Sequence, residues 1–138
     1  MGWADADSTE FNQDSRHPVI SLESQEGTIR LGAGESVLEP GTHIFAAYGE
    51  NRIWERHRHR YEFTNKYRDE MTGAGLKIAA LTTDSGLVEC IEWPGHPWGV
   101  GVQFHPEFKS KPTAAAPLFR DFIAAAKDFK NRNHGEAQ

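Results

Sequence analysis

Two residues near the C-terminal end of the sequence, His105 and Glu107, have the types and the spacing of an acid–base pair. They follow the apolar residues 100–104, which predict a buried strand, and Pro106 predicts that the strand ends between them. Side chains two positions apart in an extended segment point the same way, so the Glu107 carboxylate can reach one ring nitrogen of His105. That contact would fix the tautomer of the imidazole and leave its other nitrogen free to take a proton from a cysteine or serine. The same spacing is also typical of a surface salt bridge.

A second group of chemically active residues lies in the stretch 52–63, where arginine and histidine alternate. In a strand, Arg56, Arg58 and Arg60 would share one face. His57 and His59 would share the other. Three guanidinium groups on one face repel one another, so the pattern predicts an anion among them, either a carboxylate or a phosphate. The alternatives are a charged edge strand that resists aggregation and, in a hydrolase, a zinc site at the two histidines; no third ligand has the spacing of a zinc site, so we expect no metal.

Length and composition predict one domain in a reducing compartment. The 138 residues are 38% hydrophobic, which is enough for a core. The net charge of −5 argues against a general binder of nucleic acid. A single cysteine, Cys90, allows no internal disulfide and is expected to be a small core residue. No apolar run has the length of a membrane helix, so we expect a cytoplasmic protein that contacts no membrane.

The elements that would position these residues are strands, hairpins and two helices. Strands are predicted at 17–20, within 25–34, at 36–39 before a tight turn, at 52–63, and at 76–81 and 87–93 as an antiparallel hairpin. A short helix is expected over 66–71 with Asn65 as its N-cap. The closing helix, 115–129, carries an apolar stripe that is expected to pack on the sheet, and residues 131–138 are expected to form a mobile tail. The class is α/β, a mixed sheet with a C-terminal helix in a single domain spanning 1–138.

The motifs resemble those of class I glutamine amidotransferases, whose catalytic triad is Cys-His-Glu. Gly101-Val-Gln-Phe-His-Pro-Glu-Phe108 is similar to the end of such a domain. Ser8-Thr-Glu-Phe11, Glu55-Arg-His-Arg-His-Arg-Tyr-Glu62 and His105-Pro-Glu-Phe-Lys-Ser-Lys-Pro112 resemble one branch of the class, the glutaminase domain of CTP synthases. The similarity runs from about residue 4 to about residue 130, and it implies part of a flavodoxin-like fold.

The resemblance also implies roles for individual residues. In the complete enzyme, glutamine hydrolysis would supply ammonia for the ATP-dependent amination of UTP to CTP. His105 would be the general base and Glu107 would orient it. Glu10 would bind the α-ammonium of glutamine and Arg60 its α-carboxylate. The residues implied near GTP, the allosteric activator, are Thr28, Arg30 and Arg58.

Several parts of the family pattern are missing from this sequence. The family's nucleophile lies in Gly-x-Cys-x-Gly, and no such motif occurs here. By comparison the chain is expected to begin just after the nucleophile's helix and to lack the synthase domain that binds ATP and Mg²⁺, so the chain itself would hold no cofactor. We therefore expect an inactive chain with an uncovered sheet edge, which pairs with the missing N-terminal part or forms a homo-oligomer. The alternative is a non-catalytic module that binds glutamine or a nucleotide.

Overall fold

The computed structural model describes residues 2–22 and 29–135. The strands in chain order are β1 (Ala6–Ser8), β2 (His17–Ser21), β3 (Arg30–Leu38), β4 (Arg52–His59), β5 (Glu62–Phe63), β6 (Lys77–Thr82), β7 (Val88–Glu92) and β8 (Val100–Val102). The helices are α1 (His43–Tyr48), α2 (Arg68–Gly73) and α3 (Pro117–Gly135), and two short 3₁₀ turns are η1 (Asn65–Tyr67) and η2 (Pro106–Phe108).

The larger sheet has five strands in the order β4-β3-β6-β7-β8, and every neighbouring pair is antiparallel. Its longest strand, β3, is continuous, so the prediction of two separate strands within 25–39 is wrong. One of the glycines that suggested a break, Gly34, is a site of close packing. A Cβ atom at Gly34 would lie 2.9 Å from Cε1 of the His57 ring, which occupies the space that a side chain would need. The predicted β6–β7 hairpin is confirmed.

Helix α1 lies between β3 and β4 and was not predicted. Its N-cap is Thr42, whose hydroxyl accepts the N–H of Phe45 (3.2 Å). The N–H groups of His43 and Ile44 donate to the buried carboxylate of Glu92 (3.0 and 2.9 Å). A threonine before the apolar residues 44–47 and a glycine after them are typical helix boundaries, so the signal was present in the sequence. The expected cap of the next helix is wrong: Asn65 begins η1, and its amide donates to the carbonyl of Gly86.

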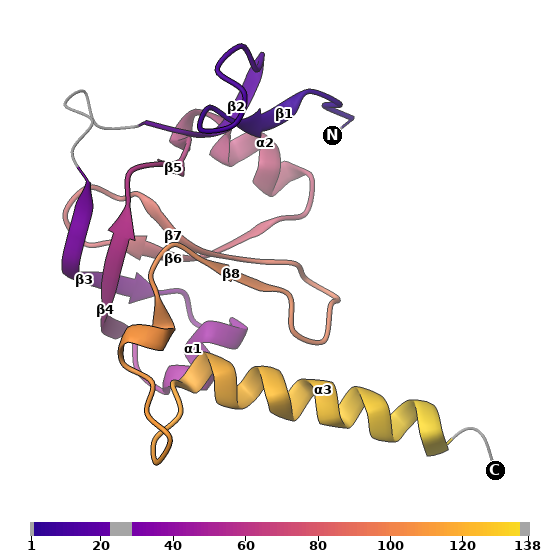
Figure 1. Cartoon of the computed structure of the whole chain (residues 1–138). Helices are drawn as coiled ribbons and strands as arrows, with labels where there is room; N and C mark the ends of the chain where they lie inside the picture. The colour runs from indigo at the N-terminus through magenta and orange to yellow at the C-terminus, as the bar shows by residue number, and fades with distance from the viewer. Residues whose placement is uncertain (1, 23–28, 136–138) are drawn as a thin grey trace.

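A smaller sheet of three strands, in the order β1-β2-β5, lies at one end of the larger one (Figure 1). Strand β1 runs parallel to β2, and β5 runs antiparallel to β2. Consequently the C-terminal ends of β1 and β2 and the N-terminal end of β5 lie at the same end of this sheet. The predicted strand at 17–20 is confirmed by β2.

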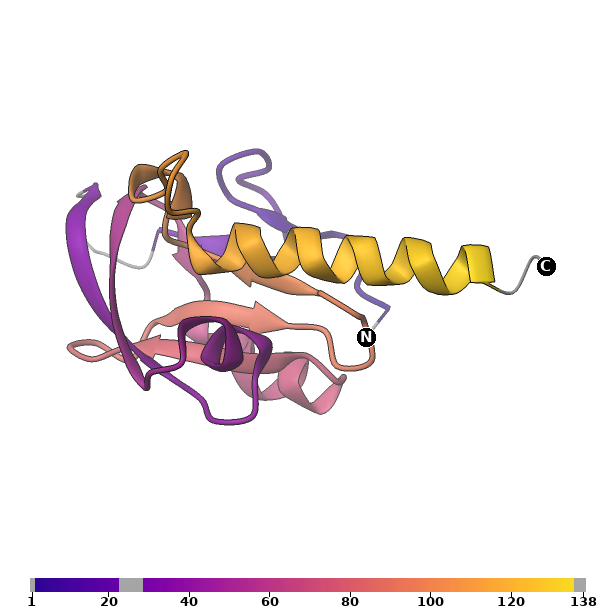
Figure 2. The same cartoon turned by 90° about the horizontal axis from the view of Figure 1, so that it is seen from below.

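Helix α3 packs on the sheet only near its start, at Leu118, so the prediction that its apolar stripe packs on the sheet holds only there. It contacts α1, where the Arg120 guanidinium donates to the carbonyl of Ala47 (2.9 Å), and Leu118 is buried near its start. Farther along, α3 extends beyond the sheet (Figure 2), and Phe122 and Ile123 are 51% and 63% exposed. Helix α3 is longer than the part of the fold that it contacts, so residues 126–132 of its C-terminal half are exposed. It also continues to Gly135, so the expected tail from residue 131 is wrong over 131–135.

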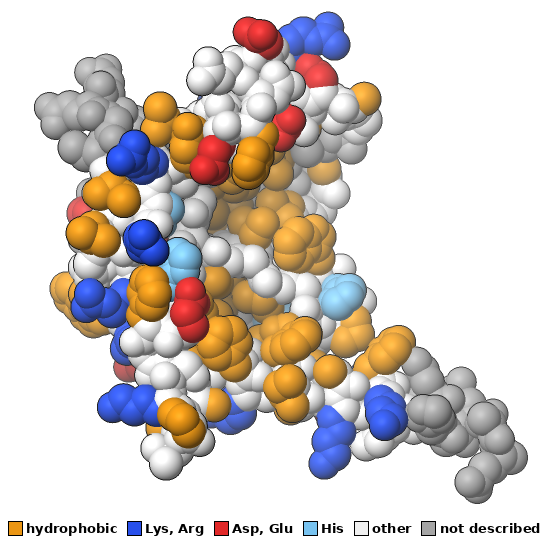
Figure 3. All heavy atoms as spheres, viewed as in Figure 1, with side chains coloured by type: hydrophobic (Ala, Val, Ile, Leu, Met, Phe, Trp, Pro, Cys, Tyr) orange, Lys and Arg blue, Asp and Glu red, His pale blue; other side chains and the backbone are white. Residues whose placement is uncertain are grey.

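Apolar side chains gather on the face that Figure 3 shows, in a hollow between the small sheet and α3. A groove on this face lies between β8 and α3; we call it the β8–α3 surface, and its apolar lining residues are Trp98, Val100, Val102, Pro106, Leu118, Phe119 and Phe122. Within the described residues, β8 pairs only with β7, so the expectation of an open sheet edge is confirmed there. No helix in the same part of the chain has the length and apolar character needed to cross a membrane.

We expect the isolated chain to self-associate through the β8–α3 surface, because water-exposed aromatic side chains gain free energy when they are buried. Light scattering should give a mass that rises with concentration, and Phe122→Ser should lower it. The matched control is Phe11→Ser, since Phe11 is 82% exposed but does not line this surface. A compact wild-type monomer at all concentrations would contradict the expectation.

Candidate active site

The predicted contact between His105 and Glu107 is present, but a tight turn makes it rather than an extended strand. Strand β8 ends at Val102, two residues before the predicted end, and His105 is the N-cap of η2. Pro106 occupies the first position of this turn, where its fixed φ is suited to helical geometry. The turn brings Oε1 of Glu107 to 2.6 Å from Nδ1 of His105.

This geometry leaves one nitrogen of the imidazole available for chemistry. The hydrogen bond from His105 holds the pKa of Glu107 below its usual range, so the carboxylate is ionised at neutral pH and Nδ1 is the donor. Nε2 of the neutral ring is then the free base. The ring is also stacked on Phe108, with 4.9 Å between the centroids. An oriented imidazole of this kind can take a proton from a nucleophile that is brought to Nε2.

Strand β4 confirms most of the predicted alternation. Arg56 and Arg58 are exposed, whereas His57 is buried and His59 is nearly so. The strand ends at His59, so Arg60 lies outside it, in the turn before β5, and the prediction that it shares the arginine face is wrong.

The two histidines of β4 bind buried carboxylates. Nε2 of His57 lies 2.7 Å from Oε2 of Glu89, and Nε2 of His59 lies 2.9 Å from Oε1 of Glu62. Arg30 links the two pairs, because its guanidinium is ion-paired with Glu89 and lies 3.7 Å from Oε1 of Glu62. The described residues include no group of three or more His, Cys, Asp or Glu that could hold a metal ion. The alternating pattern predicted neither carboxylate partner.

Glu89 is fully buried, and its charge depends on these partners. Burial by itself raises the pKa of the carboxyl. The hydrogen bond from His57 and the positive charge of Arg30 outweigh that effect, so the pKa of Glu89 lies below its usual value. We infer that Glu89 is ionised in the folded protein and that the five-residue network of Arg30, His57, His59, Glu62 and Glu89 is a structural feature of the fold.

The two residues assigned to glutamine lie at the same end of the small sheet. Glu10 follows β1, Arg60 precedes β5, and β2 lies between these strands. Two strand spacings of about 4.8 Å each put the β1 and β5 backbones roughly 10 Å apart. Both side chains are exposed. An acidic and a basic group at this separation can bind the ammonium and the carboxylate of one amino acid between them.

The two described residues assigned to GTP, Arg30 and Arg58, are not grouped by the structure. Thr28 lies outside the described residues. Arg30 begins β3 with its guanidinium turned toward Glu89 and Glu62, whereas Arg58 is exposed on the opposite face of β4.

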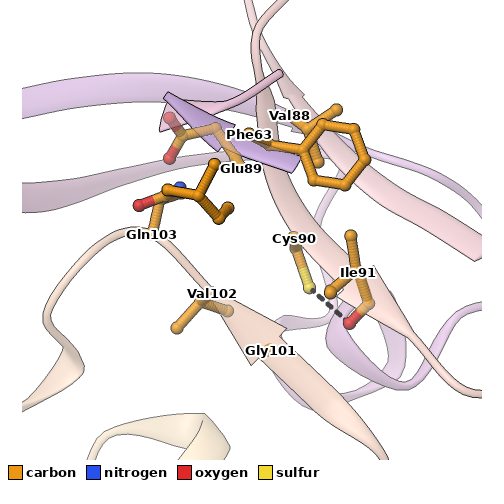
Figure 4. A pocket seen from close by; sticks show the side chains of 9 residues that line it. Phe63, Val88, Glu89, Cys90, Ile91, Gly101, Val102 and Gln103 are labelled. Carbon is orange, nitrogen blue, oxygen red and sulfur yellow. Dashed lines mark hydrogen bonds between the residues drawn. The ribbon is translucent and has the colours of Figure 1, made fainter. Parts of the chain in front are cut away.

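The single cysteine lies in an apolar pocket of about 200 Å³ (Figure 4). Strands β2, β5, β7 and β8 and the following Gln103 line this pocket, and none of the residues assigned to glutamine does. Cys90 is 1% exposed, and burial raises the pKa of its thiol far above the usual range. The prediction that Cys90 is a core residue is confirmed, and a thiol in this state is a poor nucleophile.

Comparisons with known proteins identify the family and the fold of the chain. A model of the glutamine amidotransferase class-I family matches residues 17–125. The CTP synthases of Moorella thermoacetica and Carboxydothermus hydrogenoformans are 54% identical over 128 residues and 53% identical over 132 residues; the matches cover 88% and 91% of this chain, and 24% and 25% of those proteins. The chain therefore spans about a quarter of the length of these relatives.

A solved structure, the glutaminase domain of Trypanosoma brucei CTPS with bound acivicin, superposes with a TM-score of 0.85 at 39% identity. The match covers 92% of this chain and 52% of that one. The predicted fold, part of a class I glutamine amidotransferase domain, is confirmed.

We expect neutral His105 to be held as the Nδ1–H tautomer. Long-range ¹H–¹⁵N spectra of the labelled chain should show a protonated Nδ1 and an unprotonated Nε2, because the Glu107 carboxylate accepts from Nδ1. Glu107→Gln should weaken this preference, since a neutral amide is a poorer acceptor. The matched control is Glu10→Gln, on the small sheet. An Nε2–H tautomer in the wild-type chain would contradict the assignment of the base.

We expect Glu89→Gln to lower the free energy of unfolding at pH 7 by about 3 kcal/mol, because it leaves buried His57 without its anionic partner and Arg30 with only the more distant Glu62. Urea unfolding measures this value. Glu35→Gln, which disrupts the exposed pair with Arg52, is the control and should cost under about 0.5 kcal/mol.

The same pair of proteins gives a pH test of the Glu89 charge. Because its pKa is lower in the folded chain than the usual 4.5, ionised Glu89 stabilises the fold fully above that value. The contribution is lost as the pH falls through the lower, folded-state pKa. The stability of the wild type should therefore decline more steeply below about pH 4.5 than that of Glu89→Gln. Equal slopes would show that Glu89 is not ionised in the fold.

Proposed function

The chain belongs to the class I glutamine amidotransferase family, and we propose that it is the C-terminal portion of the glutaminase domain of a CTP synthase. The activity proposed for the complete enzyme is the hydrolysis of glutamine to supply ammonia for the ATP-dependent amination of UTP to CTP, a step of pyrimidine nucleotide biosynthesis. The observation that carries the proposal is the 2.6 Å contact between Nδ1 of His105 and Glu107, which leaves Nε2 free.

In this proposal His105 is the general base and then the general acid. Nε2 takes the proton of a cysteine thiol, and the thiolate attacks the side-chain amide carbon of glutamine. The imidazolium returns the proton to the departing ammonia. In the second half of the cycle Nε2 accepts a proton from the water that hydrolyses the thioester. The C–S bond breaks, and the imidazolium returns this proton to the departing thiolate, which restores the free thiol and the neutral base. Glu107 orients the ring throughout and stabilises its charged form.

The cysteine of this reaction is not supplied by the described part of the chain. Cys90 is buried, does not lie in a Gly-x-Cys-x-Gly turn, and has a raised pKa. We therefore propose that the nucleophile lies on the part of the domain that this sequence does not contain. The β8–α3 surface supports that arrangement, because its exposed apolar side chains need a covering partner. The partner is the remaining part of the domain or a second copy of the chain.

We propose that Glu10 and Arg60 bind the α-ammonium and the α-carboxylate of glutamine. Their positions at the same end of the small sheet support this assignment. A planar guanidinium is well suited to a carboxylate, which it can grip through two hydrogen bonds.

The GTP, ATP and Mg²⁺ of the family have different relations to this chain. Of the two arginines assigned to GTP, Arg58 is the better-placed candidate, since the Arg30 guanidinium already binds two carboxylates. ATP and Mg²⁺ belong, in this proposal, to the synthase domain of the family. We also propose a cytoplasmic location, which suits a chain with one cysteine.

Reconstitution tests the proposal. The chain is combined with a polypeptide spanning the Moorella thermoacetica CTP synthase without its matched segment, and CTP formation is measured with glutamine and, separately, with ammonia. We expect glutamine-dependent CTP formation by the pair and none by either part alone. His105→Ala should lower the glutamine-dependent rate by about 10³-fold and leave the ammonia-dependent rate unchanged. Arg60→Ala should raise KM for glutamine.

Arg52→Ala is the control for these variants, because Arg52 is exposed at the far end of β4 from Arg60. Glutamine hydrolysis by the chain alone that disappeared in Cys90→Ala would overturn the proposed origin of the nucleophile. A stable complex without glutamine-dependent synthesis would favour the alternative, a non-catalytic module that binds glutamine or a nucleotide.

A further inference from the structure

We propose that Lys109 and Glu55 are positioning residues that hold the His105–Glu107 turn in its active geometry. The inference rests on the proposed role of His105 as the base. The turn is η2 with its flanking residues His105 and Lys109, and it lies against strand β4 (Figure 1).

Strand β4 is an edge strand of the larger sheet, so some of its carbonyl groups have no partner within the sheet and face this turn. The N–H of Leu38 donates to the carbonyl of Asn51 (2.8 Å), just before β4 begins. Antiparallel strands bond through alternate residues, so the carbonyls of Trp54 and Arg56 point away from β3. An open edge of this kind requires a cover.

The turn covers the edge at two points. The N–H of His105 donates to the carbonyl of Arg56 (2.8 Å). The Lys109 ammonium donates to the carbonyl of Trp54 (2.6 Å). The first residue of the turn is thus held by its backbone and the last by its side chain, two residues apart along β4. Glu107 lies between these two anchors.

Glu55 explains why the second anchor carries a positive charge. Its side chain is 2% exposed, and its Oε1 accepts from the Tyr48 hydroxyl (2.8 Å) and lies 3.5 Å from Nζ of Lys109. A buried carboxylate is costly without a counter-ion. Lys109 is the one cation that pairs with Glu55 among the described residues. Glu55 therefore draws the ammonium onto the edge of β4.

The contact between His105 and Glu107 is too weak to orient the imidazole without support from the backbone of the turn. The His105 and Glu107 side chains are 37% and 53% exposed, and exposed ion pairs contribute only about 0.2–1 kcal/mol. A pair this weak does not hold its own geometry. The backbone of the turn must bring Glu107 to Nδ1, and Lys109 fixes the end of that backbone. Loosening Lys109 should release Glu107 from His105 even though Lys109 does not touch the imidazole.

The test uses the full chain labelled with ¹⁵N and the variants Lys109→Met, Lys109→Arg and Glu55→Gln. Two quantities are measured: the Nδ1–H fraction of neutral His105, and the hydrogen exchange rate of the His105 amide. In Lys109→Met the amide should exchange at least about tenfold faster, since half of the edge contact is lost. The Nδ1–H fraction should fall as well. Glu55→Gln keeps an acceptor for Tyr48 but removes the charge, so it should give the same changes to a smaller extent.

The controls separate positioning from general stability. Lys111→Met removes a neighbouring exposed lysine and should behave as the wild type. Lys109→Arg retains the charge and should restore both readouts. Unchanged His105 in Lys109→Met would overturn the proposal, and so would faster exchange spread evenly over all amides, which would show general destabilisation.

Failure of the positioning role and failure of the proposed function give different results. If His105 is not the base, His105→Ala will keep its glutamine-dependent CTP synthesis in the reconstituted pair. The NMR readouts still report on the anchoring of the turn in that case. If the positioning role alone fails, reconstituted activity will depend on His105 but will be the same in Lys109→Met as in the wild type.

Discussion

Strand β4 directs three ionisable side chains toward the interior, and the arrangement of the site depends on how they are satisfied. Glu55, His57 and His59 occupy the inner face of this strand. Buried groups of this kind are tolerated only with partners, because water cannot solvate them. The partners come from the η2 turn, from β7 and from β5. Strand β4 therefore holds both the His105–Glu107 turn and the turn before β5 that contains Arg60.

The predictions from the sequence succeeded where the determining contacts are local. Glu107 lies two residues from His105, and the alternation along β4 was visible in the order of the residues. Partners that are distant along the chain were not predictable in this way. Glu89 lies 32 residues from His57, and only the pairing of β3 with β4 and β6, and of β6 with β7, brings the two side chains together. Within a run of strand-forming residues, a single glutamate does not reveal whether it faces solvent or a buried histidine.

The errors in the fold have equally specific causes. The break that glycines suggested in β3 was wrong because Gly34 makes room for the His57 ring, a reason that involves a different strand. The periodicity of α3 correctly predicted a helix with an apolar stripe, but periodicity does not say what covers that stripe. In this chain the stripe is largely exposed, and it adjoins the open edge at β8.

The exposed arginines of β4 repel one another only weakly. Arg56 and Arg58 are exposed and separated by two residues of a strand, about 7 Å, so in water their repulsion is only about 0.6 kcal/mol and salt screens it further. Repulsion of this size requires no anion among them. Arg60 is a better candidate for an anion site than Arg56 or Arg58. It lies beyond the end of β4, in the turn before β5. There the order of the small sheet places it at the same end as Glu10, and two opposite charges flanking one strand are what a zwitterionic amino acid can bind.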